Sequence, residues 1–142
     1  MAGYLGSSPL HLKTEIGFII ILPAFQRTHI TTNAVGLLMT YAFEPPSNGG
    51  LGMRRVQYQC NVSNAASMRV AERMGFKKEG VLRWDRVFWD GEKNLKEGNG
   101  RPPPKGREGQ KDLGRDTAIF ACCWDDWEEG LRDLVRANVD RK

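Results

Sequence analysis

The sequence contains no long hydrophobic run, and this absence excludes a large class of proteins. Its longest strictly apolar stretch is Phe18 to Leu22, whereas a helix needs about 20 apolar residues to cross a bilayer. The N-terminus also has no charged segment leading into an apolar one, as a secretory signal would. We therefore expect a cytoplasmic protein with no membrane partner.

Cysteine and histidine are scarce. The cysteines Cys60, Cys122 and Cys123 are odd in number, and neither His11 nor His29 stands at a metal-ligand spacing from them. Neither a disulfide framework nor a metal site is supported. We expect the cysteines to be small buried hydrophobic residues.

The positive charge of the chain is concentrated in one segment. Residues 92–115 hold seven basic and four acidic residues, which is +3 of the net charge of +4. The same segment has three consecutive prolines, five glycines and few aliphatic residues, so it cannot form a packed core. We expect a mobile basic loop over 91–115; an electrostatic docking arm for an acidic partner is the alternative. No nucleic-acid recognition motif accompanies the charge, so we expect no nucleic-acid partner.

The remainder has the composition of an ordinary globular domain, 40% hydrophobic and 27% charged. Its length of 142 residues predicts one domain over 1–142. Strands alternate with helices, which predicts a mixed α/β sheet. In chain order the expected elements are a strand 15–22 with both faces apolar, a helix from Thr32 with the apolar stripe Ala34, Leu37, Leu38, Tyr41 and Ala42, a strand 53–60, a helix from Asn64, an antiparallel pair 78–90 and 116–123, and a helix 124–139.

The most informative stretch runs from Asn64 to Arg83 and reads NAASMRVAERMGFKKEGVLR. Asn64 is a good N-cap, an apolar stripe follows at helical spacing, and Gly75 stands where a helix needs a left-handed last residue. From the residues alone, this is a helix packed on a sheet. The wording resembles the C-terminal signature of the GNAT superfamily of acyl-CoA-dependent N-acyltransferases, especially its RimJ/RimL-like branch. The resemblance implies a mixed, mostly antiparallel sheet flanked by helices, and acetyl-CoA as cofactor.

In the complete family fold, two strands and two helices precede the strand equivalent to 15–22, but only fourteen residues do so here. We therefore expect an N-terminally shortened domain, with Tyr4 and Leu5 supplying an edge strand. Three interpretations stay open: a truncated form, a remodelled small acyltransferase, or a chain that completes its sheet by forming a homodimer.

A second informative segment, PAFQRTHITTNA, joins the apolar strand to the next helix from Pro23 to Ala34. Free N–H groups at a helix start form an anion site, although the segment could also be an ordinary connection. By resemblance the coenzyme A pyrophosphate binds here, with Gln26 matching the family pattern and His29 and Thr31 at its glycine positions. The residues that the resemblance assigns to the cofactor are Ile20, Ile21, Leu22, Gln26, Arg27, Thr28, His29, Ile30, Thr31, Thr32, Asn64 and Ser67.

Acyl transfer to an amine needs an oxyanion donor, a base for the ammonium proton and an acid for the departing thiolate. The resemblance implies backbone N–H groups around Ile20 to Leu22 as the oxyanion donors. Ser67 matches the family's Asn-x-x-Ser pattern and is the candidate acid, with water or Tyr58 as rivals. Glu15 is the candidate base, and an exposed strand-end carboxylate is its alternative interpretation.

Two functions follow. The first is an N-acetyltransferase that moves an acetyl group from acetyl-CoA to a primary amine, on a protein N-terminus or a small molecule, by direct attack. The second is a catalytically impaired module that binds acyl-CoA or a protein partner.

Overall fold

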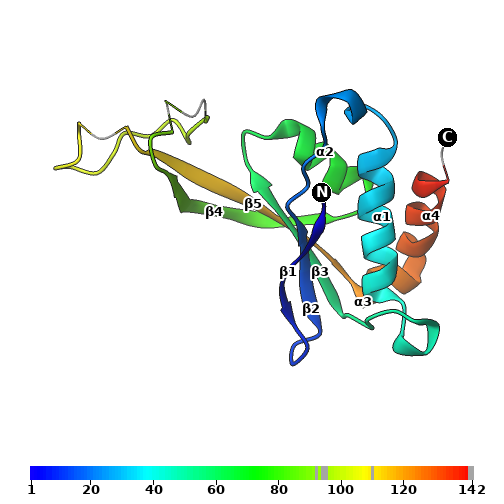
Figure 1. The fold of residues 1–142 in the computed structure, drawn as a ribbon. Coiled ribbons are helices and arrows are strands. Elements are labelled where there is room, and N and C mark those ends of the chain that lie inside the picture. The colour runs from blue at the N-terminus through cyan, green and yellow to red at the C-terminus, as the bar shows by residue number, and fades with distance from the viewer. Residues whose placement is uncertain (92, 94–95, 110, 141–142) are drawn as a thin grey trace.

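The computed structural model describes residues 1–91, 93, 96–109 and 111–140. It contains a five-stranded sheet in the order β1-β2-β3-β5-β4, with β2 and β3 parallel and the other neighbours antiparallel. Figure 1 shows the helices gathered beside the sheet and the β4–β5 hairpin projecting from it. The elements are β1 (Gly3–Ser8), β2 (Lys13–Gly17), α1 (Ile30–Phe43), β3 (Arg55–Asn61), α2 (Ala65–Arg73), β4 (Lys77–Phe88), β5 (Leu113–Cys123), α3 (Trp124–Asp126), a π-type turn (Trp127–Leu131) and α4 (Arg132–Val139), with short 3-10 turns at Pro23–Phe25 and Pro46–Asn48.

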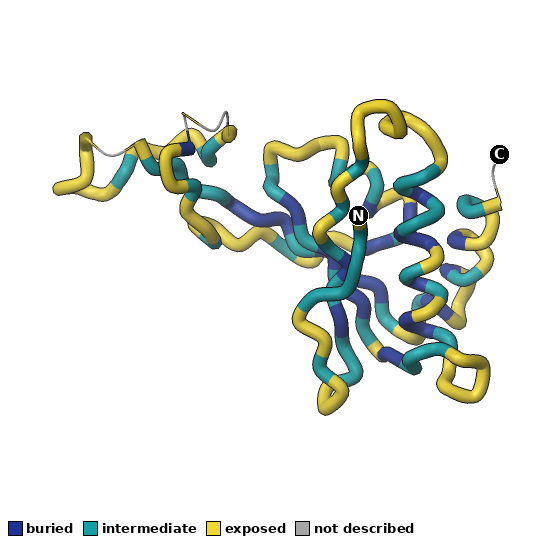
Figure 2. The backbone as a smooth tube through the Cα atoms, viewed as in Figure 1, coloured by how far each residue is buried: buried dark blue, intermediate teal, exposed yellow. Residues whose placement is uncertain are grey.

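The core lies between one face of the sheet and the helices. Alternate residues of β3, namely Val56, Tyr58 and Cys60, face it and are buried. The buried residues follow the middle of the sheet and the inner sides of α1 and α4, while the hairpin tip is mostly exposed (Figure 2). In the described part of the chain no helix covers the opposite face of the sheet, which we call the open face. The predicted fold class, a mixed and mostly antiparallel sheet flanked by helices, is confirmed.

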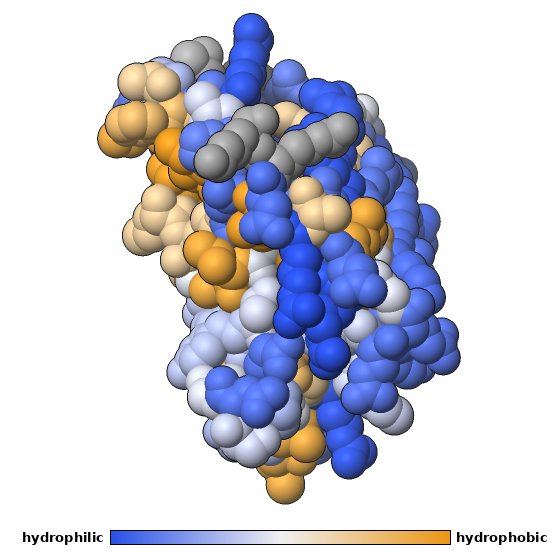
Figure 3. Space-filling model, turned by 90° about the vertical axis from the view of Figure 1, so that its right-hand side faces the viewer, coloured by the Kyte–Doolittle hydropathy of each residue, from blue (hydrophilic) through white to orange (hydrophobic). Residues whose placement is uncertain are grey.

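The outer side of the helical layer is polar. Figure 3 looks at this side, where hydrophilic residues predominate and most hydrophobic ones gather toward the left of the view. None of the helices in the described residues has the length and apolar character that crossing a bilayer requires.

Strand β2 is shorter than predicted. It ends at Gly17, and Phe18 adopts a left-handed conformation with φ of 50°, which turns the chain away from β3. Phe18, Ile20 and Leu22 are then 63%, 57% and 64% exposed. The prediction of a strand over 15–22 buried on both faces is therefore wrong. An apolar run alone does not indicate where a strand leaves its sheet.

Helix α1 is confirmed, but of the predicted stripe only Ala42 is buried. Val35 and Met39 are completely buried, whereas Leu37 is 62% exposed and Tyr41 49% exposed. The helix is apolar around most of its circumference, so its periodicity does not decide which side packs. Tyr41 instead stacks on Tyr4 of β1, the edge strand that was predicted, with 6.4 Å between ring centroids.

Helix α2 has the predicted ends. The Asn64 side chain accepts a hydrogen bond from the Ser67 N–H at 3.0 Å. Gly75 has φ of 81°, a conformation that favours glycine, and a Cβ there would lie 2.2 Å from Leu131 Cδ1, so that side chain would have to move.

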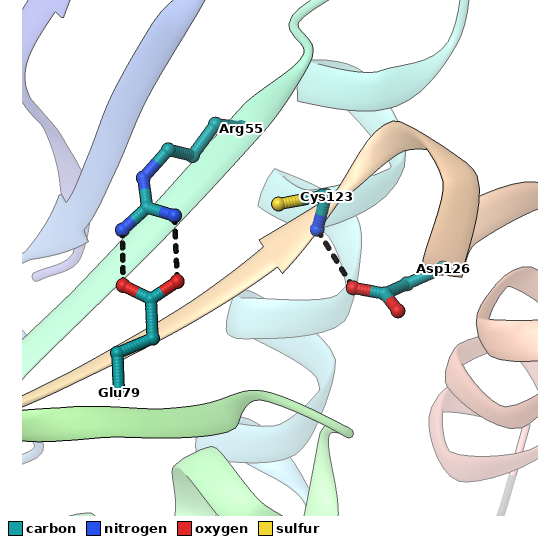
Figure 4. A network of polar contacts seen from close by, with 4 residues as sticks. All are labelled: Arg55, Glu79, Cys123 and Asp126. Carbon is teal, nitrogen blue, oxygen red and sulfur yellow. Dashed lines mark hydrogen bonds and ion pairs between the residues drawn. The ribbon is translucent and has the colours of Figure 1, made fainter.

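The predicted pair of late strands and the C-terminal helix are also present. Arg55 of β3 and Glu79 of β4 form a two-pronged ion pair with N···O distances of 2.8 and 2.5 Å (Figure 4). The Cys123 N–H donates to Asp126 at 3.1 Å and starts the helical segment. Gly130, with φ of 123°, interrupts that segment.

Candidate active site

A cleft opens where β2 and β3 part. The two strands pair in parallel register from Lys13 with Arg55 to Ile16 with Tyr58, after which β2 ends and β3 continues to Asn61. The resulting cleft has a volume of about 560 Å³. Its walls come from four parts of the chain: the end of β2, the end of β3, the start of α2 and the β4–β5 hairpin. The lining residues are Ile16, Gly17, Phe18, Ile19, Tyr58, Gln59, Cys60, Asn61, Ser63, Asn64, Ser67, Phe88, Lys96, Glu97 and Arg115.

Two hydroxyl groups meet on the wall of this cleft. Tyr58 of β3 is 3% exposed, and its hydroxyl lies 2.8 Å from the Ser67 Oγ in the first turn of α2. Asn64 fixes this turn by capping the helix through its Oδ1, while its Nδ2 has no partner among the described residues. The structure thus brings the predicted residues Asn64 and Ser67 into one cleft with Tyr58, which had been named only as a rival acid.

Burial changes the pKa values of two residues on this wall, Tyr58 and Cys60. It raises the pKa of Tyr58 above that of an ordinary tyrosine, although the hydrogen bond with Ser67 partly offsets the effect. Burial likewise raises the pKa of Cys60, again partly offset by Ser67. Both groups therefore keep their protons at neutral pH. A protonated tyrosine can serve as an acid, whereas a protonated thiol is a poor nucleophile.

Glu15 lies beside the cleft rather than on its wall. It occupies the open face, opposite Gln57 in register, and is half-buried. Its Oε1 lies 3.6 Å from where a Cβ of Gly17 would stand, and Gly17 does line the cleft. Burial raises the pKa of Glu15, while Arg86 and Arg115 lower it by a smaller amount. A carboxylate with a raised pKa can take a proton near neutral pH.

The backbone that follows β2 is only partly available for binding. The Ile20 N–H donates to the Met1 carbonyl at 2.8 Å, and the Met1 ammonium donates to the Ile20 carbonyl at 2.7 Å. The N–H groups of Ile21 and Leu22 have no acceptor within the described chain. Of the three residues predicted as oxyanion donors, Ile20 is thus already bonded, and the role of the other two stays a prediction.

The segment between β2 and α1 is exposed and held by short-range bonds. Gln26 Nε2 donates to the Ile21 carbonyl at 3.1 Å, and Thr28 Oγ1 donates to the Phe25 carbonyl at 2.7 Å. Arg27 has φ of 60°, the left-handed conformation that glycine adopts most readily. In Figure 1 this segment lies at the same end of the molecule as α2.

The start of α1 offers unbonded donors. The Ile30 N–H reaches Thr28 Oγ1 at 3.4 Å, but the N–H groups of Thr31 and Thr32 have no acceptor in the described residues. Exposed Arg27 and His29 lie just before them. The start of a 14-residue helix with free N–H groups and a nearby cation suits an anion.

The β4–β5 hairpin forms the far wall of the cleft, which was not predicted from the sequence. Asp116 of β5 is 6% exposed and accepts hydrogen bonds from the Trp84 N–H at 2.8 Å and Asn99 Nδ2 at 2.9 Å. Arg101 adds an ion pair at 3.2 Å. Asn61 Nδ2 donates to the Glu97 carbonyl at 3.3 Å and ties the loop to β3. The basic loop thus reaches the cleft through contacts that no local sequence pattern reveals.

A group of metal-ligand type lies elsewhere. Cys123, Asp125 and Asp126 place one ligand atom each within 4.8 Å of one another at the start of α3. The Asp126 carboxylate is already engaged, since it accepts from the Cys123 N–H and pairs with Lys77. This group does not line the cleft.

Comparisons with known proteins agree on one family. A model described as "Acetyltransferase (GNAT) domain" matches residues 1–77. The uncharacterized N-acetyltransferase YoaA of Bacillus subtilis is 33% identical over 81 residues, which are 57% of this chain and 42% of that protein.

Solved structures show the same relationship. A GCN5-related N-acetyltransferase from Brucella melitensis is 29% identical with a TM-score of 0.70, and the match covers 96% of this chain and 49% of that one. A probable GNAT-family acetyltransferase from Chromobacterium violaceum is 33% identical with a TM-score of 0.65, covering 89% of this chain and 50% of that one. The chain thus spans about half the length of the relatives it matches.

Proposed function

Because the chain belongs to the GNAT acetyltransferase family, we propose that it transfers the acetyl group of acetyl-CoA to a primary amine by direct attack. The observation that carries this proposal is the cleft between the parting ends of β2 and β3, with Tyr58 and Ser67 hydrogen-bonded on its wall. The acceptor is a protein N-terminus, as in the RimJ/RimL-like branch, or a small-molecule amine.

The chain has groups that can bind the cofactor at the start of α1 and at the start of α2. The free N–H groups of Thr31 and Thr32, with Arg27 and His29 nearby, would hold the pyrophosphate of acetyl-CoA at the start of α1. Asn64 Nδ2, which the helix cap leaves free, would donate to the pantetheine arm. The acetyl group would then lie in the cleft beside Ser67.

Tyr58 and Ser67 supply the acid. Acetyl transfer forms a C–N bond and breaks the C–S bond, and the departing thiolate needs a proton. The Tyr58 hydroxyl keeps its proton because burial raises its pKa. It can pass that proton through the Ser67 hydroxyl, which Tyr58 contacts at 2.8 Å, to a sulfur beside Ser67.

Glu15 supplies the base. The acceptor must lose a proton from its nitrogen for the amide to form, and Glu15 lies beside the cleft with a raised pKa. Ile21 and Leu22 offer backbone N–H groups for the tetrahedral oxyanion. These groups therefore come from β2 and the segment that follows it, from β3, and from helix α2.

A calorimetric titration tests the cofactor half of this proposal. The chain is titrated with acetyl-CoA, with coenzyme A and with adenosine monophosphate as the nucleotide control, and a thiol-release assay follows with a panel of amines. Acetyl-CoA binding with amine-dependent thiol release supports the enzyme. Binding without thiol release favours the non-catalytic module, and a folded chain that binds no coenzyme contradicts the enzyme and leaves only a module that binds a protein partner.

A further inference from the structure

Two cationic residues that line the cleft, Lys96 and Arg115, form no salt bridge with the described residues. Arg115 of β5 lines the cleft, and its Nε is buried with no hydrogen-bond partner. It forms no salt bridge with any of the described residues. Most buried polar atoms in proteins are hydrogen-bonded, so this exception calls for an explanation.

The neighbours of Arg115 increase the cost of leaving it unpaired. Arg86, its register partner on β4, carries the same charge. The nearby Asp85 carboxylate is engaged elsewhere, since its Oδ2 accepts from Thr117 Oγ1 at 2.7 Å and from Arg86 Nε at 3.3 Å. A partly buried guanidinium beside a second one is stabilised when an anion binds to it.

A group of the opposite charge also lies beside the cleft. Glu15 Oε1 is 3.6 Å from where a Cβ of the cleft residue Gly17 would stand, and Glu15 forms no salt bridge with Arg115. Glu15 and Arg115 are thus a negative and a positive group that are not paired with each other. A ligand that carries both an ammonium and a carboxylate complements this pair.

We propose that the acceptor is a small amino acid whose carboxylate binds Arg115 while its amine lies toward Glu15. This assignment rests on the proposed function and narrows it, because a protein N-terminus has no carboxylate next to its amine. The planar guanidinium can donate two parallel hydrogen bonds to such a carboxylate, which fixes the direction in which the amine points.

Matched acceptors test the assignment. Thiol release from acetyl-CoA is measured with glycine and L-alanine and with their uncharged amides. The amides have less basic amines, so a preference for the acids cannot come from a larger supply of neutral amine. We expect a kcat/KM for each acid about 10- to 100-fold above that of its amide, the range for a hydrogen-bonded charge pair.

Three variants locate the effect. Arg115→Met should bring the ratio of kcat/KM for the acid to kcat/KM for the amide close to one. Arg115→Lys should give an intermediate ratio, because lysine keeps the charge but cannot donate two parallel hydrogen bonds. Arg86→Met removes a neighbouring cation that does not line the cleft, and it should keep the ratio of the unaltered protein. Thermal unfolding of each variant shows that it is folded.

A binding measurement separates this assignment from the proposed function. N-acetylglycine and N-acetylglycinamide are titrated into the protein in the presence of coenzyme A, with no turnover needed. Stronger binding of the acid, lost in Arg115→Met but kept in Arg86→Met, supports the assignment even if no acetyl transfer occurs. Equal binding of the two, or an equal loss in both variants, overturns it even in an active enzyme.

Discussion

The hydroxyl groups of Tyr58 and Ser67 lie 2.8 Å apart and join strand β3 to helix α2 at the wall of the cleft. The Asn64 cap fixes the position of Ser67 on the helix, and burial holds the Tyr58 ring in the core. The Tyr58 hydroxyl is thus held where it can pass a proton through the Ser67 hydroxyl.

Replacing Tyr58 by Phe or Ser67 by Ala should each lower kcat by about 100-fold or more, the contribution typical of a general acid. If the two hydroxyls act as one relay, the double variant should lose little beyond either single variant. The kcat of the unaltered protein, the two single variants and the double variant is measured by steady-state thiol release. Losses that multiply in the double variant would show that the hydroxyls act separately.

Replacing Glu15 by Gln should lower kcat/KM by about 100-fold or more and remove the acidic limb of the pH–rate profile. Because burial raises the pKa of Glu15, that limb should lie above the usual pKa of glutamate. A variant with the unaltered profile would exclude Glu15 as the base.

The same substitution should stabilise the fold at neutral pH. The folded chain binds the Glu15 proton more tightly than the unfolded chain, so the free energy of unfolding falls as pH rises from the ordinary to the raised pKa. Glu79 is the matched control on the open face, because its hydrogen bonds with Arg55 lower its pKa. Glu79→Gln should thus destabilise the protein at neutral pH and leave the acetyl-transfer rate unchanged. Thermal unfolding of both variants across pH tests whether Glu15→Gln stabilises the fold while Glu79→Gln destabilises it.

Asn64 should show separable roles. Asn64→Ala removes the helix cap and should cost about 1 kcal/mol of stability, and it should also weaken acetyl-CoA binding. Asn64→Ser keeps a capping oxygen but has no amide to donate, so it should keep most of the stability and still bind acetyl-CoA more weakly. Denaturant unfolding and calorimetry report the two effects, and unchanged affinity in the Ser variant would remove Asn64 from the cofactor site.

Asp116 should control the hairpin wall. The hydrogen bond from Asn99, followed by that from the Trp84 N–H, lowers the pKa of Asp116. The ionised Asp116 carboxylate thus stabilises the fold above the usual aspartate pKa of about 3.9, and this stabilisation is lost as pH falls through the lowered pKa of Asp116. Asp116→Ala should increase hydrogen exchange across residues 96–101 and raise KM for the amine, while acetyl-CoA affinity stays the same. Unchanged exchange there would show that other contacts hold the wall.

What the sequence could predict depended on the range of the interactions. The cap at Asn64, the stop at Gly75 and their helix depend on neighbours within a few residues, so the local pattern indicated them correctly. The early end of β2 depends on the conformation of Phe18, which follows from no hydrophobic pattern.

The site shows the same limit. Ser67 came from a short motif, but its contact with Tyr58 requires β3 and α2 to be folded together. Arg115 lies in a segment that composition predicted to be a loop. The pairing of β4 with β5, the Asp116 contacts and the hydrogen bond from Asn61 to Glu97 bring that segment to the cleft.

The most direct test of the account is mass spectrometry of the acceptor amines after incubation with acetyl-CoA and the protein, with free thiol measured in the same samples. We expect an acetylated amine and one equivalent of coenzyme A thiol, both reduced about 100-fold or more by Tyr58→Phe and by Ser67→Ala. A folded protein that binds acetyl-CoA but acetylates no amine above the uncatalysed rate would contradict it.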